Sequence, residues 1–223
     1  MKTCVVIPTY NESRTIGGLV NKIRQQNLEV LVVDDGSQDN TLQIAQDNGA
    51  KVLRNPGNMG KGVSLIKGFH YSLAHDFDAV ITMDGDGQHR CEDIPYFIRL
   101  AKYSASSMFI GNRMFQTQNM PAIRILTNKF MSWLVSRVAG QEIPDTQCGF
   151  RLIKKDVLKK IRLQSSKFEI ESEIIIKAAA LGFKIETVPI KTIYNKEKSR
   201  INPLIDTLRF FHFIIRQIWT TRC

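Results

Sequence analysis

A glycine-rich acidic segment, DGDGQ at residues 84–88, directly follows an apolar run. Its carboxylates, Asp84 and Asp86, stand two residues apart on a turn opened by glycines, so they can converge on one hard cation. Mg²⁺ and Mn²⁺ prefer oxygen ligands and usually bind few carboxylates together with substrate phosphates. A calcium loop of the EF-hand kind needs more oxygens and a later glutamate, which this segment lacks. The segment therefore predicts a divalent-metal site, where the metal would bridge a diphosphate and stabilise it as a leaving group.

Three more polar segments stand at or just past the ends of predicted strands: PTYNE at 8–12, DDGS at 34–37 and GKG at 60–62. In open α/β sheets, ligands bind beyond the carboxyl ends of the strands. Asp34 and Asp35 end a buried apolar strand, where a carboxylate needs a partner or a ligand. Helix capping explains one such aspartate but not the whole set. These segments together predict a ligand-binding edge of the sheet.

The apolar pattern that must position these segments alternates strands with helices. Predicted strands cover residues 4–8, 30–35, 51–54, 79–84, 108–113, 150–155 and 184–190. Predicted helices cover residues 12–26, 39–48, 60–74, 92–102, 120–140, 169–181 and 201–219. The alternation indicates βαβ units, and the near-continuous apolar strands indicate a sheet covered on both faces. We therefore expect an α/β protein with a mainly parallel sheet.

The composition is that of an ordinary globular protein, with 43% hydrophobic and 23% charged residues among 223. It excludes a disordered, collagenous or coiled-coil chain. We find no apolar run of the about 20 residues that a membrane span needs and no signal-peptide pattern. The four cysteines have neither metal nor disulfide spacing. We therefore expect reduced thiols in a cytoplasmic protein.

The positive charge is concentrated in the second half of the chain. The net charge is +10, of which residues 1–112 contribute −1 and residues 113–223 contribute +11. A basic half should face an anionic partner, such as nucleic acid, phospholipid or a phosphorylated substrate. We expect one domain, 1–223, that joins a nucleotide-binding half to a basic accessory half.

The segments PTYNE, VVDDGS, GKG and MDGDGQH, in this order, resemble glycosyltransferase family 2. IGNR at 110–113 and DTQCGFRLI at 145–153 are similar to its dolichol-phosphate mannose synthase-like branch. The resemblance, which covers residues 3–200, implies a GT-A fold, a GDP- or UDP-sugar donor, Mg²⁺ or Mn²⁺ and inverting transfer. The branch implies a polyprenyl (dolichyl or undecaprenyl) phosphate acceptor at a membrane. Residues 1–112 would then bind the nucleotide-sugar and residues 113–200 the acceptor, with 201–223 as an amphipathic helix.

The resemblance also assigns roles to individual residues. Nucleotide-sugar binding falls on Pro8, Tyr10, Glu12, Val33, Asp35, Lys61, Asp84, Gly85 and Asp86. The metal falls on Asp86 and Gln88, and catalysis on Asp86 and Arg113. Gly85 and Gly87 occupy places where some relatives carry Ala and Leu, so we expect a more flexible loop that keeps the metal ligands.

An acceptor phosphate is already anionic at pH 7, so it needs cations to position it rather than a general base. The candidates for this contact are Arg113, Arg124, Asn128 and Arg200. Arg124 and Asn128 share one helix face because they are four residues apart. Asp145 has an ordering role as readily as a catalytic one. Glu169 and Glu171 open a helix, where acids favour the N-terminal dipole.

The predicted helix 201–219 has an apolar face and a polar stripe, which fits a helix lying on anionic lipid or one packed on the domain. We predict that helices 121–139 and 201–220 face the membrane. The protein would then be peripheral at the inner face of the cytoplasmic membrane, alone or with a membrane-spanning partner subunit.

Three other functions are weighed against this one. A glycan or lipid hydroxyl acceptor would need a base, for which Asp145 and Glu169 are the candidates. A nucleotidyltransferase would carry a Gly-rich basic loop after the first strand, where this chain has PTYNESR. A nucleic-acid-binding module is favoured only by the pI of about 9.6, and the sequence contains no recognisable nucleic-acid motif. We therefore expect no nucleic-acid partner.

Overall fold

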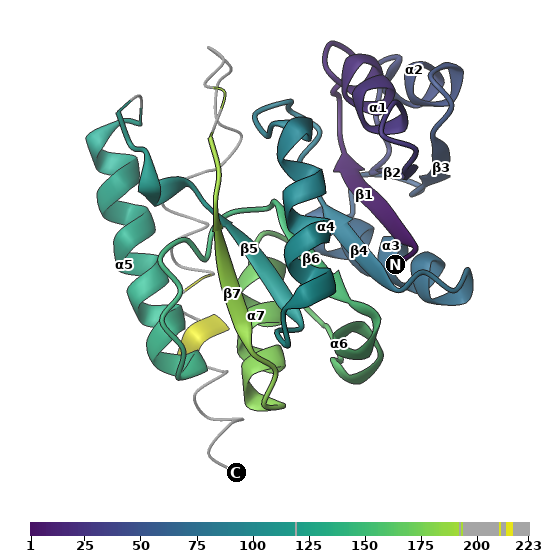
Figure 1. Ribbon diagram of the computed structural model, residues 1–223. Coiled ribbons are helices and arrows are strands. Elements are labelled where there is room, and N and C mark those ends of the chain that lie inside the picture. The colour runs from purple at the N-terminus through teal and green to yellow at the C-terminus, as the bar shows by residue number, and fades with distance from the viewer. Residues whose placement is uncertain (119, 192, 194–209, 211–212, 216–223) are drawn as a thin grey trace.

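A seven-stranded sheet in the order β3-β2-β1-β4-β6-β5-β7 forms the centre of the computed structural model, which describes residues 1–118, 120–191, 193, 210 and 213–215 (Figure 1). The strands are β1 (Thr3–Thr9), β2 (Glu29–Asp34), β3 (Lys51–Arg54), β4 (Ala79–Thr82), β5 (Met108–Asn112), β6 (Arg151–Lys154) and β7 (Ile185–Pro189). The α-helices are α1 (Ile16–Arg24), α2 (Thr41–Asp47), α3 (Lys61–Ala74), α4 (Ile94–Tyr103), α5 (Ala122–Ala139), α6 (Lys155–Lys160) and α7 (Ile170–Ala180). Two short 3₁₀ turns are η1 (Cys91–Asp93) and η2 (Arg113–Phe115).

Strand β6 runs against its neighbours in the described sheet. β1 pairs in parallel with β2 and β4, and β5 pairs in parallel with β7. β6 lies between β4 and β5 and is antiparallel to both. The amino end of β6, at Arg151, therefore shares a sheet edge with the carboxyl ends of the parallel strands. This direction brings the segment 145–150 to the same edge as the acidic segments.

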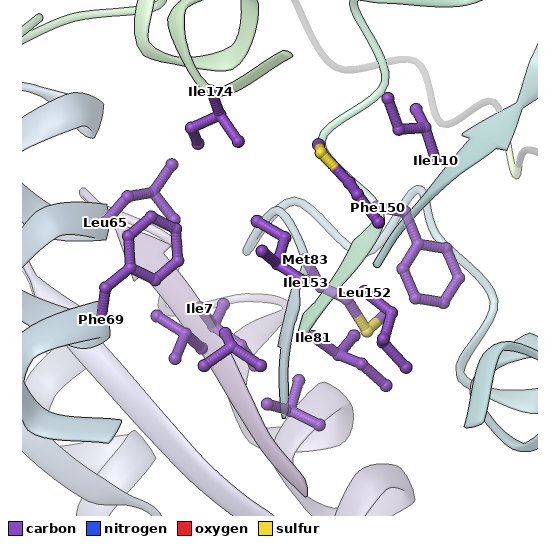
Figure 2. Packing of buried hydrophobic residues seen from close by; sticks show 14 of the residues in the cluster. Ile7, Leu65, Phe69, Ile81, Met83, Ile110, Phe150, Leu152, Ile153 and Ile174 are labelled. Carbon is purple, nitrogen blue, oxygen red and sulfur yellow. The ribbon is translucent and has the colours of Figure 1, made fainter. Parts of the chain in front are cut away.

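Helices cover both faces of the central strands, which explains why β1, β2, β4, β5 and β6 are almost wholly buried, whereas the outer strands β3 and β7 are more exposed. Figure 2 shows Leu65 and Phe69 of α3 approaching Ile7 of β1, with Phe150 on the far side of β6. There the Phe150 ring lies 4.5 Å from the ring of Phe97 in α4. Each fully buried side chain of this size stabilises the fold by about 1.5–3 kcal/mol. This packing fixes the strands and hence the positions of the loops at their ends.

The structure confirms the α/β class and the mainly parallel sheet, with small differences at element ends. Helix α1 begins at Ile16 rather than at residue 12, because Asn11 has a positive φ of 54°, residues 13–15 form a turn, and the Thr15 carbonyl accepts the first helical bond, from Leu19 N. The predicted strand 79–84 ends at Thr82. Helix α6 was not predicted, since it follows β6 without a turn residue.

Much of the predicted helix 201–219 and its polar stripe lies outside the described residues. Phe210, Phe213 and Ile214 are described and buried, so this part of the segment packs on the domain. Within the described part of the chain, no helix has the length and apolarity needed to cross a bilayer.

The three described cysteines are free and buried, in line with the expectation of reduced thiols. They are Cys4, Cys91 and Cys148. Burial raises the pKa of the Cys4 and Cys148 thiols to about 12, so both stay protonated and unreactive at neutral pH.

Candidate active site

The sheet edge at the end of β4 holds an ion cluster, made of Lys61, Asp84, Arg151 and Glu171. Lys61 opens α3, Asp84 follows β4, Arg151 opens β6 and Glu171 lies in the first turn of α7. Sequence reasoning placed Lys61 and Asp84 here. Glu171 and Arg151 join them only because β6 and α7 return to this edge.

Lys61 bridges two carboxylates from different parts of the chain. Its Nζ donates to Asp84 Oδ1 at 2.5 Å and to Glu171 Oε1 at 2.6 Å. Burial alone would lower the pKa of Lys61, but the charges of Asp84 and Glu171 outweigh it and raise that pKa above its usual value. Lys61 therefore stays charged, and it ties α3 to α7 across the sheet edge.

The amino end of α3 is occupied by the segment 165–166 rather than open to an anion. Gly62 N and Val63 N donate to the Ser166 carbonyl oxygen at 2.8 and 3.3 Å. A Cβ on Gly62 would overlap the Ser165 carbonyl oxygen. The glycines of GKG therefore permit this backbone contact. Because Gly62 N and Val63 N are already bonded to Ser166, these two N–H groups are not open to bind a phosphate at the helix end.

Asp84 is held on several sides. Besides Lys61, it has His89 Nε2 at 3.4 Å from its Oδ2. A Cβ on Gly149 would overlap the same carboxylate, so the backbone of the segment 145–150 packs closely against it. Burial alone would raise the pKa of Asp84, but Lys61 and His89 outweigh it and lower that pKa below its usual range. Asp84 is therefore ionised and fixed.

Asp86 lies two residues further on, and its charge is not balanced in the same way. Its Oδ1 accepts a hydrogen bond from Gln88 N at 3.0 Å. In the described part of the chain it forms no salt bridge. Burial and the nearby charge of Asp84 raise the pKa of Asp86. A half-buried carboxylate beside a second carboxylate is stabilised by a cation at this point.

The donor chemistry at Asp86 fits Mg²⁺ or Mn²⁺. The side-chain oxygens of Asp86 and Gln88 are hard ligands on one short turn. Among the described residues, no group of three or more His, Cys, Asp or Glu could hold a metal ion together. A cation with two protein ligands would take its remaining ligands from water and diphosphate oxygens, as Mg²⁺ commonly does.

Arg113 and Asp145 form a second buried pair at this edge. Arg113 Nε and Nη2 donate to Asp145 Oδ2 and Oδ1, each at 2.8 Å. The backbone N–H of Arg113 also donates to Oδ2, at 3.0 Å. Burial would lower the pKa of Arg113, but the bonds to Asp145 raise it above its usual value. Both oxygens of Asp145 are thus occupied, and the pair is bidentate and neutral overall.

Arg151 organises the segment 145–150. Arg151 is 1% exposed, and its guanidinium donates to three carbonyl oxygens: Thr146 O at 2.8 Å, Cys148 O at 2.7 Å and Glu171 O at 2.5 Å. These bonds fold the segment back on itself and join it to α7. The sequence offered a signal that was not used: an arginine inside the apolar run FRLI must find partners if the strand is buried.

Asp35, predicted to lie near the nucleotide base, has protein partners on both oxygens. Oδ1 accepts from Asn55 Nδ2 at 2.8 Å and Met59 N at 3.0 Å, and Oδ2 accepts from Gly60 N at 2.7 Å. These bonds hold the turn that leads into α3. A contact between Asp35 and a base stays a prediction.

The other predicted donor residues lie along the same edge. Pro8 and Val33 are register partners in β1 and β2, and the Val33 side chain is fully buried. Gly85 lies against the end of β1, because a Cβ there would overlap Thr9 Cγ2, and Thr15 Oγ1 donates to its carbonyl oxygen at 2.6 Å. Tyr10, the residue after β1, is half-buried. The structure thus joins the 8–15 and 84–88 segments.

The predicted acceptor residues come from different elements of the fold. Arg113 is in the buried pair, whereas Arg124 and Asn128 lie on α5. Asn128 is 7% exposed, and its Nδ2 has no hydrogen-bond partner among the described residues. Arg200 lies outside the described residues. Their joint contact with a phosphate stays a prediction.

A family model described as "Glycosyl transferase family 2" matches residues 4–162. The UDP-N-acetylglucosamine--dolichyl-phosphate N-acetylglucosaminyltransferase of Methanococcus voltae is 30% identical over 215 residues, covering 86% of this chain and 86% of that protein. The undecaprenyl-phosphate mannosyltransferase of Micrococcus luteus is 30% identical over 207 residues, covering 85% and 83%. The dolichol-phosphate mannosyltransferase of Pyrococcus furiosus is 34% identical over 191 residues, covering 79% and 53%.

The fold is shared with a solved glucosyl-3-phosphoglycerate synthase from Mycobacterium tuberculosis, in complex with Mn²⁺ and UDP-glucose. The TM-score is 0.76, with 19% sequence identity, and the match covers 99% of this chain and 78% of that one. At this identity the likeness concerns the fold. It confirms the predicted GT-A architecture.

Proposed function

Because this chain belongs to glycosyltransferase family 2, we propose that it transfers a sugar from a nucleotide-sugar donor to polyprenyl phosphate at a membrane surface. Family membership makes it a glycosyltransferase. The acceptor class is supported by relatives whose names specify dolichyl or undecaprenyl phosphate, at 30–34% identity over 79–86% of this chain.

The observation that carries the choice of acceptor is the state of Asp145. A hydroxyl acceptor must lose a proton to a base within hydrogen-bond reach. Asp145 is fully buried, and both of its oxygens accept hydrogen bonds from Arg113. A carboxylate bound in this way is a poor base, because accepting a proton would break a bidentate ion pair. A phosphate acceptor needs no such base, which supports polyprenyl phosphate over a hydroxyl.

In the proposed step, an oxygen of the acceptor phosphate attacks the anomeric carbon of the donor sugar. The bond between that carbon and the β-phosphate oxygen breaks, and the nucleoside diphosphate leaves with the electron pair. Attack opposite the leaving group inverts the anomeric centre. The acceptor oxygen is anionic at pH 7, so no proton moves before attack.

Within this step, the chain's own residues bind and orient the reactants. Asp86 and Gln88 would hold Mg²⁺ or Mn²⁺, which when bound supplies positive charge to the leaving diphosphate. Arg113 uses Nε and Nη2 for Asp145, which fixes its guanidinium plane and leaves Nη1 to meet a phosphate. Asp84, held by Lys61, keeps the turn before Asp86 in place.

Helix α5 supports a peripheral membrane contact. Its exposed apolar stripe, between 47% and 72% exposed, consists of Ile123, Leu126, Phe130 and Trp133 at spacings of three and four residues. The buried face of the helix instead carries Asn128, Ser132 and Val135. Exposed Lys129 and Arg137 flank the stripe. An apolar stripe with an interfacial tryptophan and basic neighbours suits anionic lipid.

The transfer itself is tested with GDP- and UDP-linked sugars, Mn²⁺ and vesicles that contain polyprenyl phosphate. We expect lipid-linked sugar from one nucleotide class. Unphosphorylated polyprenol in matched vesicles is the control acceptor and should give no product. Transfer to polyprenol but not to its phosphate would instead establish a hydroxyl acceptor. The location at the inner face of the cytoplasmic membrane and a membrane-spanning partner subunit stay predictions.

A further inference from the structure

Glu171 is a buried acid from the second half of the chain that contacts the donor side of the site. Its side chain is 8% exposed, and Oε1 lies 2.6 Å from Lys61 Nζ. Its Oε2 lies 3.8 Å from Arg151 Nη2. A helix-dipole role, which the sequence favoured, requires no such partners. The contact with Lys61 spans 110 residues of sequence and leads directly to Asp84.

We propose that Glu171 is a positioning residue for donor binding, which acts through Lys61 to fix the Asp84 carboxylate beside the metal-binding Asp86. This inference rests on the proposed function, because it assumes that the donor's diphosphate binds at Asp86. Glu171 itself touches neither donor nor metal in this proposal.

The geometry gives a reason why one carboxylate on Lys61 would not suffice. A lysine ammonium is a point charge on a flexible stem, and a single carboxylate can hold it in many orientations. Two carboxylates, at 2.5 and 2.6 Å, restrict the ammonium to the space between them. Asp84 is confined as well, by His89 and by the Gly149 backbone. Asp84 thus has one position, and the turn that carries Asp86 starts from it.

The balance of charges around Asp86 also points to Glu171. Lys61 and Arg151 are balanced by Asp84 and Glu171, so the charge of Asp86 remains for a cation. Replacing Glu171 with glutamine leaves this group with one excess positive charge near Asp86. That charge would oppose a divalent cation in a poorly solvated site. Metal-supported nucleotide binding should therefore weaken.

The test is a double-mutant cycle with Glu171→Gln, Lys61→Met and the double variant. Binding of GDP and UDP in the presence of Mn²⁺ is measured by calorimetry, without any acceptor. We expect Glu171→Gln to weaken binding about tenfold, and to have a clearly smaller effect when Lys61 is already methionine. In the transfer assay, the KM for the donor should rise and the KM for polyprenyl phosphate should not. Glu186→Gln is the matched control, since Glu186 is a partly buried acid bonded to Ser104 and Ser106.

Several outcomes would overturn the inference. Wild-type affinity in Glu171→Gln would show that Glu171 does not position the donor site, while the proposed function stands. Additive losses in the double variant would show that Glu171 does not act through Lys61. If the wild type binds neither nucleotide, the proposed function and the inference fail together. Should Glu171→Gln not fold, Glu171→Asp keeps the charge but withdraws it from Lys61, and a smaller loss of nucleotide binding is expected; wild-type affinity in this variant would overturn the inference.

Discussion

A buried aspartate, Asp145, and a half-buried one, Asp86, lie at one edge of the sheet and differ in how their charge is balanced. Asp145 is matched by Arg113 alone, through a bidentate pair with no open oxygen. Asp86 stands beside a second carboxylate, and no salt bridge of the described residues compensates it. The first arrangement is complete without a ligand, whereas the second is stabilised by a cation. The difference separates a carboxylate whose charge is balanced within the fold from one whose charge the described residues leave unbalanced.

The largest effect is expected at the completed pair. Asp145→Asn leaves the Arg113 guanidinium buried without its counter-charge, which should cost about 3–5 kcal/mol of unfolding free energy. Urea denaturation followed by circular dichroism measures this. Asp156→Asn, at an exposed position of α6, is the control and should stay within about 0.5 kcal/mol of the wild type. Equal stability of the two variants would mean that the pair does not hold the fold.

Asp86→Ala should have the opposite profile, because among the described residues Asp86 has no ion-pair partner to lose and gives up one hydrogen bond, from Gln88 N. Transfer activity should fall at least about a hundredfold, and Mn²⁺-supported nucleotide binding should disappear. The melting temperature without ligand should stay near the wild-type value or rise, since a repulsion from Asp84 is removed. Thermal shift with and without GDP, UDP, Mn²⁺ and EDTA measures both. Retained metal-dependent binding would move the metal site elsewhere.

Glu173 is another carboxylate whose charge is balanced by protein partners, so its effect on stability should depend on pH. Burial alone would raise its pKa, but Lys177 and the N–H groups of Ser165 and Gln164 outweigh it and lower that pKa. A lowered folded-state pKa adds stability above the unfolded pKa, about 4.3, and this is lost as pH falls through the folded value. We expect Glu173→Gln to lose about 2 kcal/mol at pH 7 and less at pH 3. A pH-independent difference, by urea denaturation, would contradict this.

The smallest effect is expected on the α5 surface, where the exposed apolar stripe would be covered by lipid in the proposed membrane contact. Leu126→Glu should weaken binding to anionic vesicles about tenfold, because it puts a negative charge into the proposed lipid contact. Cosedimentation measures this. Tyr103→Glu is the control, since Tyr103 is 81% exposed on α4. Equal binding by both variants would remove α5 from the membrane contact.

Local pattern predicted most of the elements, as two cases show. The strand 51–54 was predicted with the bounds that β3 has, because apolar residues and the Gly49 stop mark it locally. The predicted helix 120–140 corresponds to α5. This helix ends at Ala139, and the next residue, Gly140, adopts the left-handed conformation that glycine favours. Helix α6 was missed because it begins directly after β6, so no turn residue separates the strand pattern from the helix pattern.

The candidate site was predicted only in part. The segments that follow β1, β2 and β4 were placed correctly, because parallel strands present their carboxyl ends together. Glu171 was interpreted as a helix-end charge, since the sequence does not show that α7 lies against Lys61. The assignment of Asp35 to the nucleotide stays a prediction, and only the structure shows that its oxygens also bond to Asn55 and to the backbone of the following turn.

By itself, the sequence determined the order of strands and helices, the acidic edge and the family, because apolar period and short motifs depend on neighbours along the chain. The tertiary structure alone decided that β6 runs antiparallel between β4 and β5. That direction places Arg151 and the 145–150 segment at the acidic edge and makes the Arg113–Asp145 and Lys61–Glu171 pairs. Strand order and direction follow from packing among residues far apart in sequence, which no local pattern contains.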